Sequence, residues 1–295
     1  MLNRRDFNRF TALGAALAPG FTFAENATLA AIDRRGHGVA LPVVGLGNSK
    51  AFTAADLTIA GELLKLFAQQ GGGYVDLSGA SRTNVGQLAT QNALTDELFL
   101  GNYLELGNPS ETREEIEALK KAQDKSALDL VNSRDVANFA DKAKAYRALQ
   151  EEGLVTHIGV ASFGVQATEI MADLVEQGLV DFVQVNYSLM EPDAEQRLLP
   201  LAMARGVNVV VNRPFINGKY FDYVKGQALP DWAAEFDCKS WAQFALKYII
   251  ANPAVTCVIT ETANLNHARD NLAAGFGRLP NAAQQQKMRD FVADI

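Results

Sequence analysis

The segment "GGGYVDLSGASRTNVGQL", residues 71–88, decides the fold class. Its apolar start has the character of a buried strand, and that strand ends near Asp76. A few small polar residues then lead into a segment with the spacing of a helix. The same order, a Val-, Ile- and Leu-rich strand followed by an amphipathic helix, recurs along the chain and gives eight units. Buried parallel strands have this nearly continuous apolar character, so the pattern indicates an α/β protein.

Eight consecutive strand–helix units predict a closed (β/α)8 barrel, or TIM barrel. The expected strands lie at residues 43–48, 73–79, 98–104, 128–134, 157–163, 182–189, 208–215 and 255–260. The alternative is an open, doubly wound sheet, which needs a glycine-rich phosphate loop after its first strand. The sequence "GLGNSKAF" (45–52) matches such a loop poorly. Residues 32–44 predict a short β-hairpin that precedes the barrel.

Composition limits the classes of partner. The chain has 295 residues, of which 48% are hydrophobic, so a large core can form. Its formal net charge is -7, which argues against a nucleic-acid partner because nucleic-acid binding needs clustered Lys and Arg. No apolar run is long enough to span a bilayer, so no membrane span is expected.

The first 24 residues have the features of a twin-arginine export signal. The pair Arg4-Arg5 precedes a short apolar stretch, and small residues end at Ala24, where cleavage is expected. This predicts a mature barrel domain of residues 25–295 in the periplasm, with the twin-arginine translocase as a partner during export. An amphipathic N-terminal helix is the alternative.

Cysteine and histidine give no sign of a disulfide framework or a metal site. Cys238 and Cys257 could pair in an exported protein, but their apolar surroundings favour two buried thiols. None of His37, His157 and His267 follows the end of an expected strand, and no cluster has metal-ligand spacing. We therefore expect no metal.

Active sites of such barrels lie at the carboxyl ends of the strands. Few of the polar residues expected there have titratable side chains. The polar residues are Asn48, Ser49, Asp76, Ser78, Asn102, Tyr103, Ser133, Arg134, Ser162, Gln184, Asn186, Tyr187, Asn212, Arg213 and residues 260–264.

At these strand ends the sequence resembles the aldo-keto reductases, over roughly residues 32–275. The motifs that carry the resemblance are "LPVVGLGN" (41–48), "YVDLSGASRTNVGQL" (74–88), "HIGVASFG" (157–164), "DFVQVNYSL" (181–189) and "TETANLNHARDNLAAG" (260–275). Two further segments, "NRPFINGKYF" (212–221) and "LPDWAAEFDCKSWAQF" (229–244), resemble an exported, twin-arginine branch of that family.

The resemblance implies reduction of a carbonyl compound by hydride from a nicotinamide cofactor. In the family a Tyr donates the proton, a Lys and an Asp tune that Tyr, and a His orients the substrate. Here Asp76 matches the Asp, but Ser81 stands at the Tyr position and Tyr103 at the Lys position. Arg134 is the nearest match to the His. The resemblance therefore implies a catalytic set that is rearranged or weakened.

The resemblance also implies a site for NADP(H), with NAD(H) as the alternative. The implied cofactor-binding residues are Ser162, Gln184, Asn212, Arg213, Arg269 and Asn271. Ala161 and Asn264 depart from the family pattern: Ala161 removes one side-chain contact, and Asn264 replaces a Lys beside the 2'-phosphate. Arg269 is then the one cation at that phosphate, which weakens the preference for NADP(H).

Three hypotheses remain open. In the first, the protein is an oxidoreductase in which Tyr103 is the acid, Arg134 lowers its pKa, and Asp76 holds Arg134. In the second, it is a pseudoenzyme that binds a nucleotide or metabolite as a sensor or assembly factor. In the third, it binds a partner and no small ligand. The structural alternatives are a buried Tyr103 with a satisfied hydroxyl, and an Arg134 paired with Asp76 or Asp135.

Overall fold

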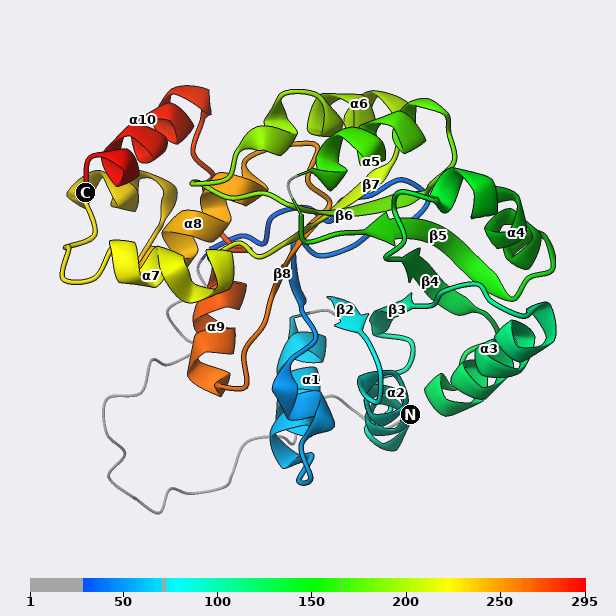
Figure 1. Ribbon diagram of the computed structural model, residues 1–295. Coiled ribbons are helices and arrows are strands. Elements are labelled where there is room, and N and C mark those ends of the chain that lie inside the picture. Colours follow the sequence, from blue (N-terminus) through cyan, green and yellow to red (C-terminus); the bar gives the residue numbers. More distant parts are fainter. Residues whose placement is uncertain (1–28, 71–72, 165) are drawn as a thin grey trace, which may run out of the picture.

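The computed structural model describes residues 29–70, 73–164 and 166–295, and the expected export signal, residues 1–24, lies outside the described residues. Eight parallel strands close into a barrel in chain order (Figure 1), which confirms the expected (β/α)8 fold. The strands are β1 (Val44–Leu46), β2 (Gly73–Leu77), β3 (Leu98–Tyr103), β4 (Leu128–Ser133), β5 (Val155–Ala161), β6 (Phe182–Asn186), β7 (Asn208–Asn212) and β8 (Cys257–Thr260).

Helices surround the barrel (Figure 1). They are α1 (Thr58–Gln69), α2 (Ser81–Gln91), α3 (Pro109–Gln123), α4 (Phe139–Glu151), α5 (Ala167–Glu176), α6 (Leu198–Arg205), α7 (Lys219–Tyr223), α8 (Trp241–Ile250), α9 (Leu265–Ala273) and α10 (Ala282–Ala293), with 3-10 turns η2 (Lys50–Thr53), η3 (Asp193–Glu195), η4 (Ile216–Gly218) and η5 (Asp231–Phe236). Helix α10 lies beyond the last unit that the sequence pattern predicts. It packs back on α8, where the ring of Phe291 stacks on Trp241 with centroids 6.2 Å apart.

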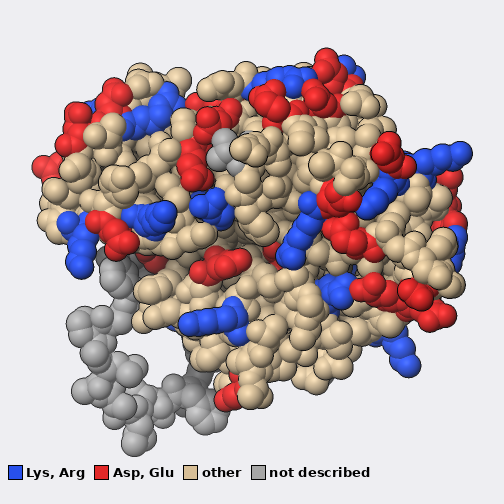
Figure 2. Space-filling model, viewed as in Figure 1, with Lys and Arg blue, Asp and Glu red and all other residues tan. Residues whose placement is uncertain are grey.

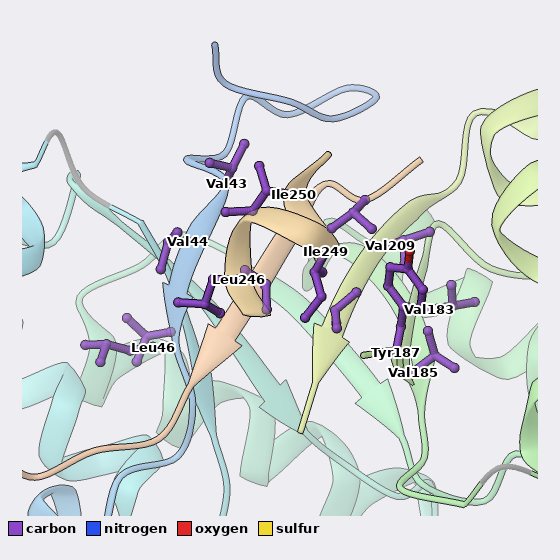
Figure 3. Close-up of a cluster of buried hydrophobic side chains, with 14 of the residues drawn as sticks. Val43, Val44, Leu46, Val183, Val185, Tyr187, Val209, Leu246, Ile249 and Ile250 are labelled. Carbon is purple, nitrogen blue, oxygen red and sulfur yellow. The ribbon is translucent and has the colours of Figure 1, made fainter. Parts of the chain in front are cut away.

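Strand side chains belong to two separate cores, and neighbouring residues of β2, β6, β7 and β8 alternate between them, as the pleat of a strand requires. The outer core joins strand side chains to the helices, and Figure 3 shows the part made by Val44, Leu46, Val183, Val185 and Val209 with Leu246, Ile249 and Ile250 of α8. The inner core fills the barrel with Leu41, Tyr74, Leu130, Phe182, Val210, Cys257 and Ile259. Val209 and Val210 are neighbours in the chain and face opposite cores, so β7 is buried on both sides.

A short hairpin closes the amino-terminal end of the barrel. Arg35 and Leu41 exchange two backbone hydrogen bonds of 2.9 and 2.8 Å and form one antiparallel bridge. The side chain of Asn208, the first residue of β7, bonds to the backbone of His37 at both 2.8 and 3.1 Å. The expected hairpin is therefore present, as a single bridge rather than a ladder, at the end of the barrel opposite the carboxyl ends of the strands.

Both cysteines are free and buried, which confirms the expectation of two buried thiols. Lys and Arg side chains are interspersed with Asp and Glu over the face in Figure 2. Within the described ranges no helix combines the length and apolar character needed to cross a bilayer.

Candidate active site

Strand register brings the expected catalytic residues to one end of the barrel. Asp76 of β2 pairs with Gly101 of β3, so Tyr103 stands two residues further towards the carboxyl end. Residues two apart on a strand share a face, and Tyr74 therefore points to the same side as Asp76. Gln184 reaches the group from β6.

These four side chains form a buried hydrogen-bonded group, which we call the tyrosine–aspartate cluster. The hydroxyl of Tyr103 donates to Asp76 Oδ2 at 3.3 Å and accepts from Gln184 Nε2 at 2.8 Å. The hydroxyl of Tyr74 lies 3.4 Å from Asp76 Oδ1 and 3.3 Å from Gln184 Oε1. Asp76 is 3% exposed and Tyr103 8%, so water has little access to either group.

Tyr74 is the member of the cluster that sequence reasoning missed. Its hydroxyl lies against Gly101, where an added Cβ atom would stand only 2.2 Å from that oxygen. Gly101 therefore makes the space that Tyr74 occupies. The available signal was the spacing of Tyr74 and Asp76 on one face of β2, together with Gly101 opposite Asp76 on the next strand.

Burial raises the pKa of the Asp76 carboxyl to about 7, against the opposing effect of hydrogen bonds from Gln184 and Tyr103. Burial also raises the pKa of the Tyr103 phenol well above its ordinary value, and the charge of Asp76 adds to that rise. Arg134 acts in the opposite direction but is outweighed. The hypothesis that Arg134 leaves Tyr103 with a lowered pKa is therefore wrong in its net direction.

Arg134 follows the last residue of β4 and stacks on Tyr103. Its guanidinium carbon lies 4.0 Å from the centroid of the Tyr103 ring and 5.9 Å from that of Phe163. Its backbone N–H donates to Glu105 Oε1 at 2.5 Å, and Glu105 Oε2 accepts from the Ser133 hydroxyl at 2.7 Å. The backbone of Arg134 is thus held in place, while its side chain is exposed at the mouth of the barrel.

The expected ion pair of Arg134 with Asp76 or Asp135 does not form. Asp135 pairs instead with Lys142 at 2.6 Å. Among the residues that the structure describes, no carboxylate lies within 4.0 Å of the Arg134 guanidinium. The cation therefore acts on Asp76 only at longer range, where it lowers the pKa of that carboxyl less than burial raises it.

Ser81, at the position where the resemblance implies a Tyr, has a structural role. Its hydroxyl donates to the carbonyl of Ser78 at 2.8 Å and accepts from the N–H of Ser78 at 2.9 Å. Ser81 is fully buried at the start of α2. These bonds stabilise the turn after β2. The proton of the Ser81 hydroxyl is used within that turn and does not point toward the mouth of the barrel.

Of the polar atoms near the expected nicotinamide site, some already have a hydrogen-bond partner within the protein and some do not. The amide of Gln184 is engaged by the two tyrosines of the cluster. Asn212 Nδ2 donates to the Ser162 carbonyl at 3.0 Å, and Asn186 Nδ2 donates to the Phe163 carbonyl at 2.8 Å. The Oδ1 atoms of Asn186 and Asn212 are both buried without a partner. Two acceptors therefore stand at the mouth, as the amide group of a carboxamide would need.

Arg213 links two loops of the mouth. Its Nη1 donates to the Phe163 carbonyl at 3.1 Å and its Nε to Asn217 Oδ1 at 3.1 Å. Its backbone has φ of +48°, a left-handed conformation that few non-glycine residues adopt. Arg213 therefore shapes the loop after β7.

Arg269 and Asn271, the residues expected at the adenosine end, both lie on α9, where Arg269 Nη1 donates to Asn266 Oδ1 at 3.3 Å. Arg269 is exposed, and Asn271 is buried. Asn264 caps the helix, since its Oδ1 accepts from the N–H groups of Asn266 at 2.8 Å and His267 at 3.3 Å. The described part of the chain has no group of three or more metal-ligating side chains.

Comparison with known proteins agrees with the barrel and its motifs. A family model described as "Aldo/keto reductase family" matches residues 45–287. The uncharacterized oxidoreductase YqkF of Bacillus subtilis is 22% identical over 191 residues, a match that covers 55% of this chain and 60% of that protein. The match thus spans less than two thirds of that curated relative.

Solved structures share the fold at low sequence identity. An aldo-keto reductase from Klebsiella pneumoniae in complex with NADPH is similar with a TM-score of 0.72 at 19% identity, over 89% of this chain and 95% of that one. The holo form of an aldo-keto reductase from Bacillus halodurans is similar with a TM-score of 0.70 at 17% identity, over 88% and 96% of the two chains.

Proposed function

The chain belongs to the aldo/keto reductase family, and from that premise we propose that it is an NAD(P)H-dependent oxidoreductase that reduces a small carbonyl compound with Tyr103 and Asp76 as its proton-delivery pair. The observation that carries this proposal is the contact of the Tyr103 hydroxyl with Asp76, 3.3 Å long and buried at the carboxyl end of the barrel.

Proton delivery follows from the pKa values of the pair. Because burial raises the pKa of Asp76 to about 7, the protonated carboxyl is well populated near neutral pH. Tyr103 alone is a poor acid here, since its phenolate would lie buried beside a carboxylate. When Asp76 is protonated, Tyr103 gives its proton to the carbonyl oxygen and takes one from Asp76. No phenolate accumulates, and Asp76 regains its proton from solvent.

The residues present fit the cofactor. The unpartnered Oδ1 atoms of Asn186 and Asn212 are acceptors for a carboxamide, and Arg269 on α9 supplies a cation for a 2'-phosphate. When bound, the reduced nicotinamide supplies the hydride. The structural neighbour from Klebsiella pneumoniae, which is in complex with NADPH, supports NADP(H) as a cofactor.

One observation favours a second candidate, a nucleotide-binding pseudoenzyme that senses a metabolite or assists assembly. Both polar groups of the Gln184 amide are satisfied by Tyr103 and Tyr74, so Gln184 cannot hold a carboxamide without opening the cluster. A weakened hold on the nicotinamide would spare adenosine binding and lose hydride transfer.

Two measurements on purified protein separate these candidates. NADPH fluorescence titration reports nucleotide binding, and NADPH consumption with a panel of aldehydes and quinones reports reduction. Binding together with turnover supports the oxidoreductase. Binding with no turnover of any carbonyl supports the pseudoenzyme, and a protein that binds no nucleotide contradicts both and favours a partner-binding role.

We further propose that the protein acts in the periplasm after export by the twin-arginine translocase. The pair Arg4-Arg5, the apolar stretch after it and the small residues before the expected cleavage after Ala24 support this. Replacing Arg4 and Arg5 with Lys is expected to leave the precursor in the cytoplasm, as cell fractionation would measure. Unchanged export of the double variant would contradict the proposal.

A further inference from the structure

Arg134 presents a cation at the mouth of the barrel on a rigid base. Its backbone N–H donates to Glu105, and its guanidinium carbon lies 4.0 Å from the centroid of the Tyr103 ring. Arg134 is exposed, and the N–H edge of a guanidinium matches both oxygens of a carboxylate.

The acids nearest to Arg134 along the chain and on the neighbouring strand are engaged elsewhere. Both oxygens of Glu105 accept hydrogen bonds, from the N–H of Arg134 itself and from Ser133. Asp135 pairs with Lys142. Within the described ranges the guanidinium of Arg134 has no carboxylate within 4.0 Å, so an anion from solution can take that place.

We propose that Arg134 binds a carboxylate of the substrate, so that the compound reduced at Tyr103 is a short oxo acid, with 2-oxo acids the best fit. The inference rests on the proposed function. The guanidinium covers the ring whose hydroxyl delivers the proton, so a carboxylate at Arg134 lies beside a carbonyl at Tyr103. A 2-oxo acid has these two groups on adjacent carbon atoms.

Negative charge near Asp76 affects whether this carboxyl is protonated when such an anion binds. The charge of Glu261, just after β8, disfavours ionisation of Asp76, and a bound carboxylate would do the same. Binding of an oxo acid therefore favours protonated Asp76, the form that reduction needs.

The test compares acids with their uncharged esters. The dissociation constants of 2-oxobutyrate and benzoylformate, and of their methyl esters, are measured by calorimetry on the full-length protein with NADPH, alongside turnover. The variants are Arg134→Met, Arg134→Lys and, as a control, Arg113→Met. Arg113 is an exposed arginine of α3 that pairs with Glu152.

We expect Arg134→Met to weaken binding of the acids by about 10- to 100-fold and to leave the esters unchanged. Arg134→Lys should fall between, because it keeps the charge without the planar fork, and Arg113→Met should match the wild type. Acids that do not bind the wild type, or that bind Arg134→Met equally well, would overturn the inference. If the acids bind through Arg134 and neither acid nor ester is turned over, the carboxylate site stands and the proposed reduction fails.

Discussion

The hydroxyl of Tyr103 lies 3.3 Å from Oδ2 of Asp76, and the ring of the same tyrosine lies 4.0 Å below the guanidinium of Arg134. One phenol thus contacts a buried carboxyl through its oxygen and an exposed cation through its face. Burial raises the pKa of the Tyr103 phenol most, and the charge of Asp76 raises it further. Arg134 lowers this pKa but is outweighed. The proton that Tyr103 delivers must therefore be replaced from Asp76.

Tyr103→Phe removes the hydroxyl and keeps the ring under Arg134. We expect kcat for carbonyl reduction to fall by about 10² to 10⁴, the usual cost of losing a general acid. NADPH binding should be unchanged, because Asn186 and Asn212 are untouched. Tyr223→Phe, at a tyrosine that is 56% exposed on α7, is the control and should keep full activity. Reductase activity that survives Tyr103→Phe would assign the proton to another source.

The rate of reduction should fall as pH rises through about 7, because reduction needs the protonated form of Asp76. In the wild type, kcat at saturating NADPH and carbonyl should drop about tenfold per pH unit well above that value. Asp76→Asn should be slower and should lose this inflection. The measurement is a kcat profile from pH 5.5 to 9, and an inflection near 7 that persists in Asp76→Asn would contradict the relay.

Asp76 should also make the stability of the wild type depend on pH. The pKa of this carboxyl is raised from 3.8 to about 7 in the folded chain, so between these values the folded state binds more protons than the unfolded state. Its contribution to the free energy of unfolding is full below pH 4 and is lost as pH rises through 7. That loss is about 1.4 kcal/mol per pH unit across the window, about 4 kcal/mol at most.

Urea unfolding at pH 5, 6, 7 and 8 measures this effect. The stability of the wild type relative to Asp76→Asn should fall from pH 5 to pH 7 and level off between pH 7 and pH 8. Asp56→Asn is the control: the Asp56 carboxyl has a lowered pKa, since it accepts hydrogen bonds from Thr58, so its titration lies below the window. Parallel stability curves for the wild type and Asp76→Asn would show that the buried carboxyl keeps an ordinary pKa.

The sequence predicted the barrel because its strands are uninterrupted apolar runs, and Asp76 could be placed since a single acid at a strand end stands out. Tyr74 could not be placed in the site, because a tyrosine beside Val75 looks like any apolar strand residue until its hydroxyl is seen to lie against Gly101. The pKa of Tyr103 depends on burial, which no local pattern contains. Sequence reasoning considered only the nearby charge of Arg134 and so obtained the wrong direction.

Gly101→Ala tests whether the cluster depends on the space that this glycine leaves. An added Cβ atom would lie 2.2 Å from the Tyr74 hydroxyl and 2.6 Å from its Cζ, so the tyrosine has to move within a closed barrel. Overpacking of this kind typically costs about 1–3 kcal/mol. We expect that loss in urea unfolding, together with a lower kcat, because a displaced Tyr74 disturbs both Asp76 and Gln184.

Gly107→Ala is the matched control, since an added Cβ atom there meets nothing within 4 Å. It should leave both stability and kcat near the wild-type values. In the double variant Gly101→Ala with Tyr74→Leu, the shorter residue 74 side chain leaves room for the added Cβ atom, so stability should be regained. Activity should not be regained, because the Tyr74 hydroxyl is gone. If Gly101→Ala is as stable and as active as Gly107→Ala, Tyr74 moves freely and has no part in holding Asp76.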